Sequence, residues 1–158
     1  MNNSEYELET IKHIRLVREY LMQVIIDITL RANLHDDTKL YEPESELFKK
    51  YTPLLRESTY LSKDYKKFLK DLKPALDHHY MCNRHHPEHF ENGIIDMNLI
   101  DLLEMLIDWI AAVKRHNDGD IHSSIEKNMG RFKYSEELKK VFLNTVTYIN
   151  NWDTVEVD

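Results

Sequence analysis

Residues 98–116 form the most apolar segment of the chain, and this segment constrains the fold more than any other. On a helical wheel its apolar side chains occupy nearly the whole circumference, as in a helix that other helices surround. The narrow remaining band holds Asp101, Glu104, Asp108 and Arg115. We therefore expect a central helix whose acidic band either reaches a thin strip of solvent or faces an internal polar site.

The rest of the sequence favours an all-α fold around that helix. Only three Gly and four Pro occur in 158 residues, charged residues make up 31%, and helix-forming side chains dominate. Apolar stripes at helical spacing predict about six to seven helices in one compact bundle. We find no linker or repeat within residues 1–158, and we expect residues 153–158 to be a frayed tail.

Capping residues and helix breakers bound the expected helices. The expected N-terminal caps are Ser4, Asn33, Ser62, Asn98 and Ser135. The first helix should end near residue 32, and a short second helix should follow. A helix is expected to begin at Pro43, a break at Pro53 and a helix bend at Pro74. A further helix is expected to end at Gly130.

Charge and cysteine content narrow the classes of function. The net charge of −7 and the pI near 5.7 argue against a protein that coats nucleic acid, because that affinity comes from clustered Lys and Arg. The single Cys82 excludes an internal disulfide, and the acidic N-terminus does not resemble a signal peptide. The longest apolar run, residues 21–30, is too short to span a bilayer. We expect a cytoplasmic protein without a membrane role, and a homo-oligomer is left open.

His35 and Asp36 are adjacent, so an imidazole nitrogen and a carboxylate oxygen could reach one metal ion from a single turn of backbone. Lys39 follows one turn later on the same side. The alternative is a charged helix start, where acids need no metal. His13, at the border of the first helix's apolar stripe, is either a half-buried packing residue or a further ligand.

Further histidines lie in the middle of the chain. The apolar stripe of the helix that begins near residue 62 arrives at His79, so His79 rather than His78 should point to the core. Residues 80–93 should form a loop, because a proline and a glycine interrupt them. This loop holds His85 and His86 next to Arg84, a composition typical of metal or anion sites. A solvated polar loop is the alternative.

Among the acids of the central helix, we expect Asp108 to be the metal ligand. Asp101 lies in the first turn, where capping and the helix dipole already explain a carboxylate. Asp108 lies in mid-helix, where a metal or a cationic partner would offset the cost of burial, and Arg115 is too distant for a relaxed pair. Glu104, one turn before Asp108, could accept a proton if it faces the same cavity.

The order of these residues resembles the HD-domain superfamily of metal-dependent phosphohydrolases across residues 9–116. That family shares an early His, an adjacent His-Asp pair, optional middle histidines and a late helical Asp, which bind one or two divalent metals inside a helical bundle. His35-Asp36-x-x-Lys39 is similar to the family's His-Asp-x-x-Lys version. The resemblance implies seven metal ligands: His13, His35, Asp36, His79, His85, His86 and Asp108.

The resemblance also implies hydrolysis of a phosphate ester, with a nucleotide as the first candidate. Lys39 or Arg84 would neutralise charge on the phosphate and Glu104 would accept a proton. The ion would be Mn, Fe, Co, Ni, Mg or Zn; one ion is expected and two remain possible. Two alternatives stay open: a metal-containing module that binds a nucleotide without turnover, and a di-iron oxygenase. Residues 83–89 and 104–109 also resemble an uncharacterised family of bacteria and phages.

Overall fold

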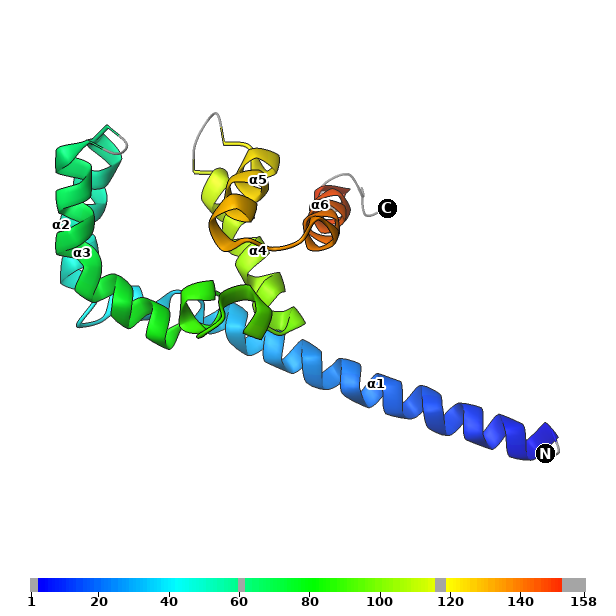
Figure 1. The fold of residues 1–158 in the computed structure, drawn as a ribbon. Coiled ribbons are helices and arrows are strands. Elements are labelled where there is room, and N and C mark those ends of the chain that lie inside the picture. The colour runs from blue at the N-terminus through cyan, green and yellow to red at the C-terminus, as the bar shows by residue number, and fades with distance from the viewer. Residues whose placement is uncertain (1–2, 60–61, 116–118, 152–158) are drawn as a thin grey trace, which may run out of the picture. The chain divides into compact units, whose positions relative to one another are not determined.

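The structure is a computed structural model that describes residues 3–59, 62–115 and 119–151 (Figure 1). Within these residues all regular secondary structure is helical, with six α-helices and three short 3₁₀-helices, which confirms the all-α prediction. The chain divides into two compact units, residues 1–35 and residues 36–158. None of the described helices is both long and apolar enough to cross a membrane. The expected frayed tail lies outside the described residues.

The first unit consists of one helix, α1 (Asn3–Leu34). The second unit holds all other elements. Its α-helices are α2 (Ser45–Glu57), α3 (Lys63–Cys82), α4 (Leu99–Val113), α5 (Ile121–Phe132) and α6 (Glu136–Asn150). Its 3₁₀-helices are η1 (Asp37–Leu40), η2 (Pro87–His89) and η3 (Gly93–Asp96).

The helix α4 has the central place that its apolar circumference predicts. Its Met105, Leu106 and Ile110 are buried in the main core, together with side chains from α5 and α6 such as Ile125 and Phe142. Several aromatic rings close one side of this core, with stacked or edge-to-face contacts among Trp109, Phe132, Tyr134 and Phe142.

A second, smaller core holds α2 and α3 together. Tyr51 from α2 and Leu72 and Ala75 from α3 are buried in it, and Phe48 and Phe68 pack around them. The side chain of Ser62 accepts a hydrogen bond from the Tyr65 amide, so this residue caps α3 as expected. The cap and the core together fix where the last turn of α3 lies, and that turn carries the candidate site.

Other expected boundaries are wrong. Asn33 lies inside α1 and caps nothing, and the expected second helix is only the single turn η1. Pro53 lies inside α2, which continues past it because the flanking apolar residues are packed against α3. Gly130 lies inside α5, and Lys133 takes the left-handed conformation at the helix end, with φ of 55°.

Candidate metal centre

The first side chain of the site is placed by a sharp turn of the backbone. Asp36 adopts a left-handed conformation with φ of 61°, which aspartate tolerates better than most residues. Its carbonyl oxygen then accepts a hydrogen bond from the Lys39 amide at 2.9 Å, which starts η1. This turn points one carboxylate oxygen of Asp36 towards the end of α3.

Three histidines come from the C-terminal end of α3 and the segment that follows it. His79 lies in the last turn of α3, and the chain then becomes extended at Asn83. His85 and His86 precede Pro87, the first residue of η2. His79 and His85 are each only 1% exposed, so the prediction that His79 points to the core is confirmed.

Four potential ligand atoms of these residues converge within 4.8 Å of one another: one carboxylate oxygen of Asp36 and one imidazole nitrogen each of His79, His85 and His86. The His79 Nε2 atom lies 3.1 Å from Asp36 Oδ1 and 2.9 Å from His86 Nε2. The His85 Nε2 atom lies 3.5 Å from Asp36 Oδ1. Donor atoms about 2.1 Å from one tetrahedral ion would be about 3.4 Å apart. The observed spacing therefore fits one metal ion with little rearrangement.

A buried carboxylate stands behind His79. Glu44 is fully buried, and its Oε2 atom accepts a hydrogen bond from His79 Nδ1 at 2.9 Å. Its Oε1 atom is 2.7 Å from Nδ1 of the neighbouring His78. With Nδ1 bonded to this carboxylate, the other ring nitrogen, Nε2, faces Asp36 and His86. This is how carboxylates orient metal-binding histidines.

The same arrangement occurs behind His85. The His85 Nδ1 atom lies 3.1 Å from Glu104 Oε1, and Glu104 comes from the central helix α4. Glu104 was predicted to accept a proton during catalysis. In the structure its carboxylate lies beside Nδ1, where carboxylates commonly orient metal-binding histidines, and Nε2 lies towards Asp36.

Two polar side chains hold Glu44 and His79 in place. Thr38 from η1 donates a hydrogen bond to Glu44 Oε2 at 3.0 Å. The Asn83 amide group donates to the Thr38 hydroxyl at 3.0 Å and to the His79 carbonyl oxygen at 2.9 Å. These bonds join η1, the start of α2 and the end of α3 around His79.

The electrostatics suit a cation. Burial alone would raise the pKa of Asp36, but hydrogen bonds from His79, His85 and Lys39 hold that pKa well below its ordinary value of 3.8. Burial and the neighbouring imidazoles of His85 and His79 lower the pKa of His86 to about 3. At neutral pH the site therefore presents an ionised carboxylate and an imidazole without its second proton, which are the forms that bind metals.

The two predicted cations have different positions. The Lys39 Nζ atom is 2.6 Å from Asp36 Oδ2, the oxygen other than the one facing the imidazoles, so Lys39 lies beside the site as expected. Arg84 instead donates to both oxygens of the fully buried Asp101, from Nε at 3.1 Å and from Nη2 at 2.9 Å. Asp101 also completes a capping box with Asn98. Arg84 is thus paired with Asp101, and Asp101 is not among the converging donor groups.

The remaining predicted ligands differ in their support. Asp108, half-buried on α4, has a carboxylate oxygen within 4.8 Å of one of Asp36. His35 is the last residue of the first unit, and its role stays a prediction. His13 is exposed in the continuous helix α1, 22 residues before His35 and so about 33 Å away along the helix axis. The prediction that His13 and His35 bind one ion from the same chain is therefore wrong.

Sequence reasoning missed Glu44, the most buried acid of the site. Its histidine partners are 34 and 35 residues further along the chain, so no local spacing reveals them. A large hollow of about 460 Å³ lies elsewhere, between the end of α4 and α5, and its lining residues include Ser123 and Lys127. It contains none of the predicted site residues.

The comparisons with known proteins identify a family but no activity. The model of a family of unknown function, DUF5662, matches residues 2–152. No curated protein and no solved structure matches the chain.

Proposed function

Because the chain belongs to the DUF5662 family, whose description carries no activity, we propose its function from its own residues: divalent-metal-dependent hydrolysis of a phosphate ester. One observation carries the proposal. Asp36 and three imidazoles converge on one point, and the ammonium group of Lys39 is held beside that point. The resemblance of His35-Asp36-x-x-Lys39 to the HD-domain superfamily supports the same reaction class.

The donor set favours some metals over others. Three nitrogen donors and one carboxylate suit Fe, Co, Ni or Zn better than Mg, which prefers oxygen ligands. Zinc would be saturated by four protein donors, whereas an ion with five or six ligands would keep positions for water and substrate. We therefore expect activity with Fe, Co or Ni, and little with Zn or Mg. A divalent ion held here would lower the pKa of a bound water and polarise a phosphoryl oxygen.

Each neighbouring side chain has a defined task in this proposal. An ammonium group has three N–H donors, so Lys39 can bind Asp36 and a phosphate oxygen at the same time. Glu44 and Glu104 keep His79 and His85 in the orientation that binds the ion. Asp108 is the acid that can accept a proton from water or add a ligand on the α4 side.

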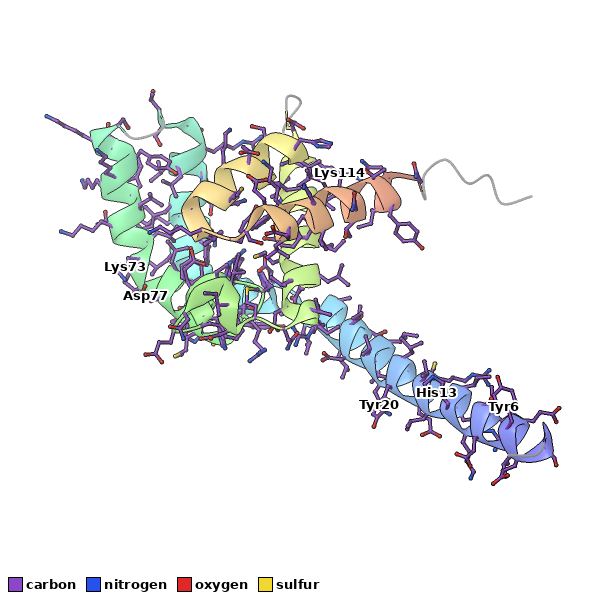
Figure 2. All side chains as sticks on the ribbon, turned by 45° about the vertical axis from the view of Figure 1, so that its right-hand side comes forward. Tyr6, His13, Tyr20, Lys73, Asp77 and Lys114 are labelled. Atoms are coloured by element: carbon purple, nitrogen blue, oxygen red, sulfur yellow. The ribbon has the colours of Figure 1, made fainter. Side chains whose placement is uncertain are left out.

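The test is a phosphatase screen over nucleotides and simple phosphate esters, with each metal supplied in turn. Lys39→Ala should lower kcat/KM about 100-fold and leave the metal content unchanged, because four ligands remain. Lys73→Ala is the matched control (Figure 2), since Lys73 also pairs with an aspartate, Asp77, at 2.6 Å but lies on an exposed face of α3. A metal-loaded parent protein that is inactive on every ester would overturn the proposal in favour of binding without turnover.

A further inference from the structure

The helix α1 carries an apolar stripe along most of its length. Ile11, Ile14, Leu21 and Ile25 are between 46% and 57% exposed, and their own unit, whose helix is α1 alone, has no other described element to cover them. A soluble protein rarely leaves so many large apolar side chains in contact with water along one continuous surface. The stripe therefore calls for a partner.

The spacing of the stripe identifies the kind of partner. Its residues alternate three and four apart, which is the heptad repeat of helices that pair side by side. Six of the seven core positions between residues 11 and 32 are apolar, and the exception is Arg18. These core positions are Ile11, Ile14, Arg18, Leu21, Ile25, Ile28 and Ala32. Tyr6, His13 and Tyr20, which Figure 2 labels on α1, are also seven apart and are not among these core positions.

We propose that α1 pairs with α1 of a second copy of this chain in antiparallel orientation. In this register Ile11 lies opposite Ile28 of the second copy, and Ile14 lies opposite Ile25 of the second copy. The stripe is thus complementary to itself when reversed. Val17 and Val24, which flank the core, also meet across the pair and widen its apolar surface.

Charge selects the antiparallel orientation over the parallel one. Parallel pairing would place Arg18 against Arg18 in one core layer, and like charges at a core position are unfavourable. It would also bring together the N-terminal glutamates Glu5, Glu7 and Glu9 of both copies. Antiparallel pairing places Arg18 opposite Leu21 of the second copy and the glutamates near Arg31 of the second copy.

Engineered cysteines test both the pairing and its orientation in the full-length protein. In a Cys82→Ser background, the double variant Val17→Cys/Val24→Cys should form a covalent dimer on oxidation, because these positions meet only between antiparallel copies. Each single variant should cross-link far less. Residues seven apart on one helix are about 10 Å apart, so no disulfide can form within a chain. Leu16→Cys/Gln23→Cys is the matched control on the opposite face and should not cross-link.

Sedimentation of the parent and of two seam variants completes the test. The parent should have twice the mass of one chain, Leu21→Glu should have the mass of one chain, and the exposed control Leu16→Glu should remain dimeric. Cross-linking of the single variants would overturn the antiparallel orientation. A parent of single-chain mass would overturn the pairing altogether. The pairing would also be overturned if Leu21→Glu lowered the unfolding temperature without changing the mass, since α1 would then pack against its own chain.

Discussion

At the scale of single residues, the two most deeply buried imidazoles of the site are each backed by a carboxylate, His79 by Glu44 and His85 by Glu104. Such carboxylates fix which ring nitrogen carries the proton and how the ring is turned. Glu44 does this for two histidines at once, with one oxygen each for His78 and His79. The affinity for a metal should therefore depend on Glu44 although it is not itself a ligand.

Glu44→Gln should weaken metal binding about 10- to 100-fold, the usual effect of losing such a partner. A glutamine of the same shape has only one acceptor oxygen, so it cannot accept hydrogen bonds from His78 and His79 as the carboxylate does. Titration of the metal-free protein with Co²⁺ measures the change. Glu46→Gln, at an exposed position two residues away, should bind as the parent does. Equal Co²⁺ affinity of the parent and both variants would show that Glu44 does not support metal binding.

The low pKa of His86 predicts acid sensitivity of the metal-free protein. This pKa is about 3 in the folded state and 6.5 for the free side chain, so between these values only the unfolded chain binds the extra proton. The contribution of His86 to the unfolding free energy is therefore complete above pH 6.5 and falls by about 1.4 kcal/mol per pH unit towards pH 3. Asp36 acts in the same direction only below its ordinary value of 3.8.

Urea unfolding at several pH values, with a chelator present, measures this dependence. Between pH 6 and pH 4.5 the unfolding free energy of the parent should fall with pH, whereas His86→Gln should show a flatter profile, because glutamine does not titrate. Parallel profiles for the two proteins would mean that His86 is not held neutral by the fold.

At the scale of elements, α4 separates a structural acid from the acids of the site. Asp101 joins the start of α4 to Arg84 through two hydrogen bonds and caps the helix with Asn98. Glu104 and Asp108, further along α4, face His85 and Asp36. One helix thus anchors the loop that carries His85 and supplies carboxylates to the site.

Asp101→Asn should cost about 2 kcal/mol of unfolding free energy, because a buried charged partner of Arg84 is lost. The metal content should not change, since Asp101 is not among the converging donor groups. Thermal unfolding and elemental analysis of the same sample give both values. The exposed Asp96→Asn, which also loses a local hydrogen-bonding carboxylate, is the control and should leave stability nearly unchanged. Loss of metal from Asp101→Asn would place this acid in the site.

The elements also show what sequence patterns can predict. Helical periodicity predicted α4 as the central helix, and local spacing predicted the caps Ser62, Asn98 and Ser135, since both depend on neighbours a few residues away. The break predicted at Pro53 and the helix end predicted at Gly130 were wrong, because α2 and α5 continue through these residues. Tertiary packing outweighed the local cost.

The candidate site shows the same limit. His79 was predicted from the apolar stripe of its helix, and His85 and His86 from the composition of the loop that holds them. Glu44 was not predicted because only the fold brings it to His79, and the Arg84–Asp101 pair was missed for the same reason. His13 was named a ligand because of the family resemblance, although a helix from His13 to residue 32 already spans about 29 Å.

At the scale of the whole molecule, the site joins η1, the end of α3, the loop after it and α4 within the second unit. A metal that binds all of these parts together binds the folded state only, so it should stabilise that state. With free metal at 100 times its dissociation constant, the gain is about 2.7 kcal/mol. Removing the metal with a chelator should lower the unfolding temperature by several degrees, and adding Co²⁺ or Ni²⁺ should restore it.

Scanning calorimetry measures this shift. The same chelator should have no effect on the double variant His79→Gln/His86→Gln, which lacks two of the converging imidazoles. If neither the chelator nor added metal changes the unfolding temperature of the parent, the donor groups do not hold an ion in the folded state.

The most direct measurement of the central claim is the metal content of protein purified without added metal. We predict about one transition-metal ion per chain in the parent, and almost none in His79→Gln/His86→Gln. His122→Gln, which changes an exposed histidine on α5, should keep the metal of the parent. A double variant that retains as much metal as the parent would contradict a centre built from Asp36, His79, His85 and His86.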